Sequence, residues 1–152
     1  MIRSCAQCGA KNRIPAVRLS DKGRCGKCGA ELPAANMPLD VDATEFREII
    51  AGARVPVLVD FWAAWCGPCK MAAPEVAKTA AAMSGRALVL KVDTESHPEL
   101  SSQYGIRGIP NFIVFRNGEV AAQHAGLVDH RTMQQWLEAA AGDSDRSGRQ
   151  AN

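Results

Sequence analysis

Apolar residues gather in short runs between residues 37 and 141, and segments with helical spacing separate these runs. Runs rich in Val, Leu, Ile and Phe are typical of buried strands. The predicted strands are residues 37–41, 55–61, 87–93, 111–115 and 120–124. Helices are predicted to start at Asp42, to cover residues 69–83 and 98–104, and to start again after Asp129. Asp42 and Glu45 are the residue types of a capping box, which supports the first of these helices.

The order of these elements predicts the fold class. Strands and helices alternate until residues 111–124, where two strands follow each other directly. Helical crossovers join parallel strands, whereas an Asn117-Gly118 turn favours an antiparallel hairpin. We therefore expect an α/β fold in which helices flank both faces of a mixed central sheet.

The first 36 residues differ in character from the rest of the chain. Seven basic and two acidic side chains give residues 1–36 a formal charge of +5, while the whole chain carries only +2. Their apolar residues are too few to form an independent core. We predict a module with its linker over residues 1–36, a main domain over residues 37–141, and a flexible tail over residues 142–152.

Composition excludes several classes of protein. A chain that is 47% hydrophobic can bury a core, so wholesale disorder is excluded. The sequence shows no apolar run long enough to span a bilayer and no secretory signal after Met1, so we expect a cytoplasmic protein without a membrane partner. The basic module could attract acidic partners. It has no aromatic residue for base stacking, so nucleic acid is not favoured.

All six cysteines occur in Cys-x-x-Cys pairs. The first two pairs, Cys5/Cys8 and Cys25/Cys28, are each followed by a glycine, which permits a tight turn. Their separation fits a four-cysteine zinc site, and four thiolates leave zinc no open position. We therefore expect a zinc ion that stabilises the module, with a structural or a regulatory role. The alternatives are an iron–sulfur cluster on the same ligands and four ordinary cysteines.

The third pair, Cys66 and Cys69, lies between a predicted strand and a predicted helix. Pro68 suits the first turn of a helix, where no N–H donor is needed. Cys66 would then stand at the helix N-terminus, which lowers the pKa of a thiol. We expect Cys66 to be a reachable thiolate nucleophile and Cys69 to be a shielded resolving thiol. The alternative, half of a second metal site, lacks further ligands.

Asp60 lies near the end of the apolar run at residues 55–61. An unpaired carboxylate is costly to bury, so desolvation should raise the pKa of Asp60. Such a group suits proton transfer with Cys69, through water. The alternative is a carboxylate in solvent at the end of a strand.

Residues 37–141 resemble the thioredoxin family. The resemblance rests on Trp65-Cys66-Gly67-Pro68-Cys69-Lys70 with the preceding Val59-Asp60-Phe61-Trp62, on Lys91-Val92-Asp93, on Gly105-Ile106-Arg107-Gly108-Ile109-Pro110, and on Gly126. The four additional cysteines resemble the zinc-binding thioredoxin 2 type of this family. Asn111 departs from the residue most common after this proline, which could alter substrate preference.

The resemblance implies a thioredoxin fold and a protein-disulfide reductase that exchanges dithiol for disulfide at a redox-active Cys66–Cys69 pair. It implies disulfide-containing protein substrates and a thioredoxin reductase as electron donor. It places Lys91 beside Asp60, with a simple surface charge as the alternative. It also implies a cis Ile109–Pro110 bond that faces the disulfide. The implied substrate-binding residues are Trp65, Gly67, Pro68, Ile109, Pro110 and Gly126.

Two other functions stay open from the sequence. A disulfide oxidase or isomerase would need an oxidising compartment and usually carries a different dipeptide between its cysteines. A zinc-dependent binding or chaperone-like module would use the main domain only as a scaffold, which the intact Cys66/Cys69 pair disfavours.

Overall fold

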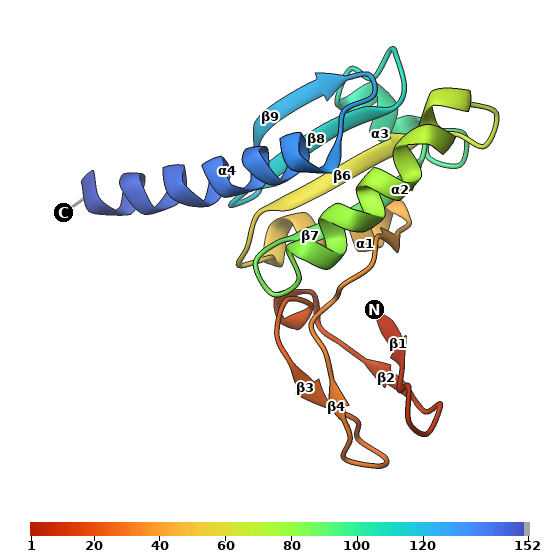
Figure 1. Cartoon of the computed structure of the whole chain (residues 1–152), viewed down its shortest axis with the longest axis vertical. Helices are drawn as coiled ribbons and strands as arrows, with labels where there is room; N and C mark the ends of the chain where they lie inside the picture. Colours follow the sequence, from red (N-terminus) through yellow and green to blue (C-terminus); the bar gives the residue numbers. More distant parts are fainter. Residues whose placement is uncertain (151–152) are drawn as a thin grey trace.

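A five-stranded mixed sheet forms the centre of the molecule (Figure 1). The structure, a computed structural model, describes residues 1–150, with side chains described as far as residue 142. Strands β5, β7 and β6 run parallel, while β8 is antiparallel to β6 and β9 is antiparallel to β8. In sheet order the strands are β5 (Leu39–Asp40), β7 (Leu88–Asp93), β6 (Val57–Trp62), β8 (Asn111–Arg116) and β9 (Glu119–Ala125).

Helices cover both faces of this sheet, as the element order predicts. Phe46 of α1 and Leu100 of α3 share one buried cluster with strands β6, β7 and β8. Val76 of α2 and Leu137 of α4 belong to a second cluster on the opposite face. The helices are α1 (Ala43–Gly52), α2 (Gly67–Ala82), α3 (Pro98–Gln103) and α4 (His130–Gln150). The mixed sheet flanked by helices confirms the predicted fold class.

Local sequence signals explain two boundaries. Asp42 Oδ1 accepts the Glu45 N–H at 2.8 Å and Glu45 Oε1 accepts the Asp42 N–H at 3.1 Å, so the predicted capping box starts α1. Asn117 and Gly118 have φ angles of 54° and 81°. Positive φ at both central residues is the geometry of a type I′ turn, which suits the twist of the β8–β9 hairpin.

Alternation along β6 directs one polar side chain toward α2. Val57, Val59 and Phe61 lie in the cluster that contains α1 and α3, whereas Leu58 lies in the cluster that contains α2. Successive side chains of a strand point to opposite faces. Asp60 therefore shares the face of Leu58, under the helix that starts at the Cys66/Cys69 pair.

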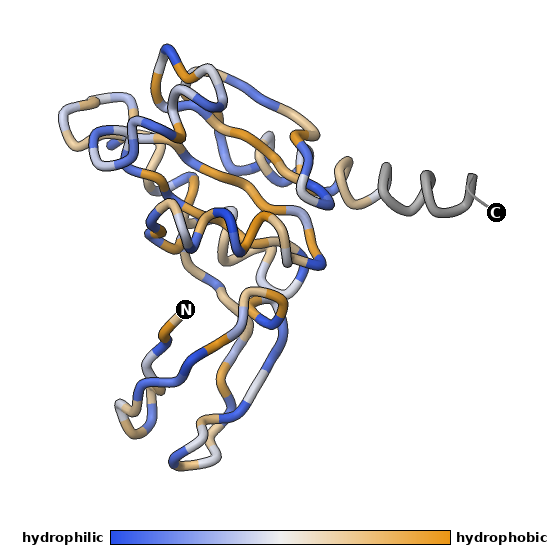
Figure 2. Tube along the Cα trace, turned by 180° about the vertical axis from the view of Figure 1, so that it is seen from behind, coloured by the Kyte–Doolittle hydropathy of each residue, from blue (hydrophilic) through white to orange (hydrophobic). Residues whose placement is uncertain are grey.

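The N-terminal segment forms two short hairpins that lie side by side beneath the sheet in Figure 1. Figure 2 shows that the strongest hydrophobic colouring follows the central strands, while the hairpins are mostly hydrophilic or neutral. The hairpins and their connection are β1 (Ile2–Ser4) with β2 (Lys11–Arg13), the 3₁₀ turn η1 (Ala16–Arg18), and β3 (Gly23–Arg24) with β4 (Glu31–Leu32).

One leucine anchors this segment in the main domain. Leu19 is fully buried and belongs to the cluster of α1 and the sheet. Its carbonyl accepts the Ala35 N–H at 3.0 Å, and Asp21 lies 3.6 Å from the Arg54 guanidinium just after α1. Leu19 and Ala35 thus contribute to the core of the main domain, although both fall within the predicted module and linker.

The ends of several elements differ from their predicted positions. Strand β5 contains only Leu39–Asp40, and α2 begins at Gly67, two residues before the predicted start. Helix α4 is assigned as far as Gln150. The flexible tail was predicted over residues 142–152. Side chains are described only as far as residue 142 and the backbone only as far as residue 150, so the tail stays a prediction. Among the described residues, no helix is both long and apolar enough to cross a membrane.

Candidate active site and zinc centre

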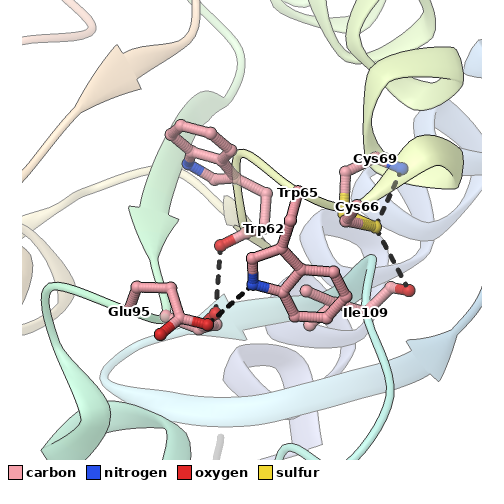
Figure 3. The surroundings of a disulfide bond; sticks show 7 residues. Trp62, Trp65, Cys66, Cys69, Glu95 and Ile109 are labelled. Carbon is pink, nitrogen blue, oxygen red and sulfur yellow. Dashed lines mark hydrogen bonds between the residues drawn. A yellow bond between two sulfur atoms is a disulfide. The ribbon is translucent and has the colours of Figure 1, made fainter.

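Cys66 and Cys69 form a disulfide at the start of α2 (Figure 3). Cys66 is the N-cap residue, and its Sγ accepts the Cys69 N–H at 3.1 Å. Gly67 and Pro68 occupy the first helical positions between the two cysteines. The unpaired N–H groups and the dipole of a helix N-terminus stabilise negative charge at this location. In the reduced protein this geometry favours ionisation of the Cys66 thiol.

Solvent exposure does not distinguish the two cysteines. Cys66 is 3% exposed and Cys69 is 6% exposed, so the expectation of a reachable Cys66 beside a shielded Cys69 is not met in this disulfide form. Trp62 and Ile109 pack against the two cysteines, and Trp65 lies beside the disulfide (Figure 3). The difference between the two sulfurs lies in their neighbours, because Cys66 Sγ receives the helical N–H while Cys69 lines a cavity.

The chain segment at residues 109–126 closes the site on one side. The Ile109–Pro110 peptide bond is cis, and the Ile109 carbonyl lies 3.7 Å from Cys66 Sγ. Gly126 donates its N–H to the Pro110 carbonyl at 2.8 Å and has a φ angle of 106°. That conformation favours glycine. Gly126 is therefore held beside Pro110, and the adjacent Ile109 approaches the disulfide.

Asp60 is buried beneath the disulfide, at 1% exposure. Desolvation raises the pKa of its carboxyl to about 7, and the positive charge of Lys91 opposes this rise only in part. Asp60 Oδ1 has no hydrogen-bond partner among the described residues. A cavity of about 250 Å³ is lined by Asp60, Cys69 and Lys91 together with Trp62, Ala63, Ala64, Lys70 and Ala73. The alternative of a solvent-exposed carboxylate is excluded.

Lys91 lies opposite Asp60 in the parallel β6–β7 pair, but its ammonium contacts the Trp62 ring. The two residues are in register, and Lys91 is half-buried. Its ammonium lies 4.6 Å from the centre of the Trp62 ring, a cation–π contact. Lys91 thus acts on Asp60 through its charge at the wall of a shared cavity. Its description as a simple surface charge does not fit this position.

Trp65 is a large exposed side chain beside the disulfide, at 69% exposure. Its indole Nε1 donates a hydrogen bond to Glu95 Oε1 at 2.7 Å, which fixes the ring across the mouth of the site (Figure 3). Glu95 was not among the residues predicted from the sequence. Its position two residues after Asp93, at the end of β7, is the signal that could have placed it at this edge of the sheet.

A hollow next to the disulfide is lined by Trp65 and Ile109. Arg107 brings a positive charge to its lining. Neither Arg107 nor the α3 side of this hollow was predicted. Its remaining lining residues are Thr94, Pro98, Ser101 and Ile106. The hollow is therefore a mostly uncharged surface adjoining Cys66.

The other four cysteines converge between the tips of the two hairpins. Their Sγ atoms all lie within 4.8 Å of one another, and the Cys5–Cys28 and Cys8–Cys25 sulfurs are 3.7 Å apart. Zinc–sulfur bonds of about 2.3 Å in a tetrahedron require sulfurs roughly 3.8 Å apart. The observed arrangement therefore fits a zinc ion held by four thiolates.

Each hairpin tip has the backbone that such a site requires. Gly9 and Gly29 directly follow the second cysteine of each pair and have φ angles of 74° and 75°. This left-handed conformation favours glycine, as the sequence predicts. In each tip the first cysteine is buried and the second is exposed.

Asn12 links the two hairpins and was not predicted from the sequence. From β2 it donates to Cys25 Sγ at 3.5 Å and accepts the Gly26 N–H at 2.9 Å, both in the second hairpin. Backbone N–H groups of Cys28, the Asn12 amide and the Lys27 N–H together lower the pKa of Cys25 to about 6. These donors favour the thiolate form that binds metal.

Comparison with known proteins agrees with both parts of this geometry. The thioredoxin family profile matches residues 37–139, and a profile described as "Thioredoxin 2, N-terminal" matches residues 4–30. Thioredoxin C-3 of Corynebacterium nephridii is 38% identical over 138 residues, which cover 91% of this chain and 94% of that protein. Thioredoxin 1 of Nostoc sp. is 44% identical over 98 residues, covering 64% of this chain and 92% of that protein.

Solved structures show the same fold. A mutant thioredoxin from Halobacterium salinarum superposes with a TM-score of 0.64 at 34% identity, covering 70% of this chain and 92% of that chain. Together with the Cys66–Cys69 disulfide and the four clustered cysteines, these matches identify the family. The chain belongs to the thioredoxin family of thiol–disulfide oxidoreductases, and it carries the N-terminal zinc ribbon of the thioredoxin 2 type.

Proposed function

We propose that this protein is a protein-disulfide reductase that works through its Cys66-Gly67-Pro68-Cys69 segment. The observation that carries the proposal is the disulfide at the N-terminus of α2, where Cys66 Sγ accepts the Cys69 N–H at 3.1 Å. A thiolate at this position is stabilised, so the reduced dithiol can attack at neutral pH. The buried Asp60 beneath the pair supplies a proton acceptor for the second step.

The first step forms a mixed disulfide. The Cys66 thiolate attacks one sulfur of a substrate disulfide, a new bond forms between Cys66 and that sulfur, and the substrate S–S bond breaks. The other substrate sulfur leaves as a thiolate and takes a proton from water. Ile109 approaches Cys66 Sγ, Gly126 is bonded to the adjacent Pro110, and Trp65 precedes Cys66, which supports a role for these residues in holding an extended substrate segment.

The second step releases the reduced substrate. Cys69 gives its proton to the Asp60 carboxylate through water in the cavity that both residues line. The Cys69 thiolate then attacks Cys66 Sγ, which forms the Cys66–Cys69 disulfide and expels the second substrate thiolate. Two electrons pass from the dithiol to the substrate. A pKa of about 7 for Asp60 suits it to this exchange, and the charge of Lys91 keeps that pKa from rising further.

The remaining assignments complete the proposal. A thioredoxin reductase would return two electrons to the Cys66–Cys69 disulfide, and the reducing cytoplasm is the compartment in which such a cycle runs. Cys5, Cys8, Cys25 and Cys28 would hold a structural zinc ion, since all four ligand positions belong to the protein. The substrates would be proteins that contain accessible disulfides.

Insulin reduction tests the proposal. Cys66→Ser should lower the rate of insulin reduction by at least about a thousandfold, because the nucleophile is lost. Cys69→Ser should instead accumulate a covalent Cys66–insulin mixed disulfide. As the matched control, Cys28→Ser changes a module cysteine and should leave the rate within about threefold of wild type. Full activity of Cys66→Ser, or a mixed disulfide on a module cysteine, would disprove the mechanism.

A further inference from the structure

We propose that the cavity between the two N-terminal hairpins is a binding site for a compact anion that carries two or more phosphate groups. The cavity has a volume of about 200 Å³. Its walls come from both hairpins, from the connection between them and from Pro33 at the start of the linker. It shares no lining residue with the cavity of Asp60 or with the hollow beside Trp65.

Positive charge dominates the lining of this cavity. The basic lining residues are Arg3, Arg13, Arg18, Lys22 and Arg24, and Asp21 is the acidic one. Asp21 lies 3.6 Å from Arg54, a cation of the main domain that does not line the cavity. Arg54 therefore offsets part of the charge of Asp21, while Lys22 lies 3.8 Å from Glu31, so the arginines carry most of the uncompensated charge.

Among the described residues, the side chains of two of these arginines have no hydrogen-bond or ion-pair partner. Arg3 donates to the Pro33 carbonyl at 2.7 Å and Arg24 donates to the Gly29 carbonyl at 3.2 Å. Within the part of the chain that the structure describes, no side-chain hydrogen bond or ion pair engages Arg13 or Arg18. A guanidinium has five N–H donors in a planar fork, so several donors remain available around one cavity.

The chemistry of these donors indicates the ligand. The guanidinium fork matches the oxygens of phosphate in bidentate pairs, and it does so better than an ammonium group. Several guanidinium groups around one cavity require more than one anionic group to balance them. The volume lies below the roughly 300–1,000 Å³ typical of sites for larger organic ligands. No aromatic side chain lines the cavity to stack a base, so a di- or triphosphate fits the site better than a nucleic acid.

The position of the cavity gives such a ligand a structural effect. The two hairpins are separate two-stranded sheets. The cysteine cluster joins them at their tips, and the Arg3–Pro33 hydrogen bond joins the first hairpin to the end of the second near the cavity. An anion held by Arg13 of the first hairpin and Arg18 of the connection would add a further link. Binding should therefore stabilise the module.

Calorimetric titration of the zinc-loaded, oxidised full chain tests the proposal, with tripolyphosphate, pyrophosphate and orthophosphate as probes. We expect one saturable site that prefers tripolyphosphate and pyrophosphate to orthophosphate. The double variant R13Q/R18Q should weaken tripolyphosphate binding at least tenfold. The matched control K11Q/K27Q removes the same charge from the same module outside the cavity, and it should change affinity less than twofold.

A conservative pair of changes separates geometry from charge. R13K/R18K keeps both charges but loses the bidentate fork, so it should bind tripolyphosphate more weakly than wild type and more tightly than R13Q/R18Q. Zinc content, measured after each titration, should be equal in all variants because none of these side chains is a zinc ligand.

Several results would overturn the proposal. One is the absence of saturable binding, and another is an equal loss of affinity in R13Q/R18Q and K11Q/K27Q, which would indicate general charge attraction. Removal of zinc by the anion would also contradict it. Tighter binding of an oligoglutamate peptide or a short single-stranded DNA than of tripolyphosphate would assign the cavity to a different class of ligand.

Discussion

The zinc centre and the redox disulfide use the same Cys-x-x-Cys spacing for opposite purposes. In the zinc centre, each pair sits on a hairpin turn that ends in a glycine with positive φ, and the two pairs face each other. In the redox pair, the first cysteine caps a helix, the second lies in its first turn, and the two sulfurs bond to each other. Backbone context after the second cysteine therefore separates a metal site from a redox site.

The two regions also differ in what stabilises them. The redox pair forms a small cluster with Ala63 at the edge of a domain whose sheet carries a large buried cluster on each face. The zinc centre is supported by a small cluster of Cys5, Cys25 and Leu32 with a few half-buried neighbours. A region with so little apolar burial depends on its metal for stability, whereas the redox pair can change oxidation state without loss of its supporting core.

Of the changes considered, zinc removal should produce the largest difference in stability between the two regions. Structural zinc contributes about 10–16 kcal/mol in small zinc domains, so a chelator should unfold the two hairpins. The main domain should keep its fold and its insulin reduction. Amide hydrogen exchange would show loss of protection confined to residues 1–18 and 20–34. Protection of the hairpins that persists after complete zinc loss would contradict this account.

Leu19→Ala should destabilise the main domain, not the zinc centre. Leu19 is fully buried in the cluster of α1 and the sheet, and such changes cost about 2.7–5.0 kcal/mol. Denaturant unfolding of the main domain measures this change. Ile2→Ala, at a residue that is 51% exposed in the same segment, is the control and should cost less than about 1 kcal/mol. Equal costs for both variants would contradict the contribution of Leu19 to the core of the main domain.

Asp60→Asn should stabilise the protein in a pH-dependent way. Burial raises the pKa of Asp60 from 3.8 to about 7, so the folded state binds a proton that the unfolded state releases. Wild-type stability therefore falls as pH rises from about 4 to 7, and the variant avoids this loss. The gain should be near zero at pH 3 and should reach at most about 4 kcal/mol above pH 7.

Denaturant unfolding at several pH values measures the Asp60 effect. The variant should also reduce insulin more slowly, because the proton acceptor for Cys69 is lost. Asp40→Asn changes an exposed carboxylate of the same sheet and should shift stability by less than about 0.5 kcal/mol at every pH. A gain for Asp60→Asn that is equal at pH 3 and pH 8 would contradict the assignment.

Asn12→Leu should have a smaller effect, confined to the zinc centre. Loss of the hydrogen bonds to Cys25 Sγ and the Gly26 N–H should weaken zinc affinity by about 10–100-fold, as for other groups that orient metal ligands. Chelator competition measures this affinity. Asn36→Leu makes the same chemical change at an exposed linker position and should leave zinc affinity unchanged. Unchanged affinity in Asn12→Leu would remove the proposed link between the hairpins.

Most of the fold was predictable because its signals are local. The apolar runs of β6, β7 and β8, the Asp42–Glu45 capping box and the Asn117-Gly118 turn each determine a conformation within a few residues. The burial of Leu19 was not predictable, because a single leucine in a polar segment does not indicate which core it enters.

The site was predictable where the chemistry lies within one segment. Residues 55–70 alone predicted a reactive Cys66 with its resolving partner Cys69 and favoured burial of Asp60, and the resemblance implied their disulfide. The partners that come from other segments were missed, because only the folded chain brings Glu95 to Trp65 and Asn12 to Cys25. The cation–π contact of Lys91 with Trp62 likewise depends on the register of two strands.

Alkylation mapping tests most directly the claim that one Cys-x-x-Cys pair is redox-active and the other two bind metal. The zinc-loaded chain would be reduced and treated with a limiting amount of iodoacetamide at pH 7, and the labelled cysteines would be located by peptide mass analysis. We predict that Cys66 is labelled first, because its thiolate is stabilised by the Cys69 N–H, and that the four module cysteines stay unlabelled. First labelling of Cys69, or of a module cysteine while zinc is bound, would contradict the account.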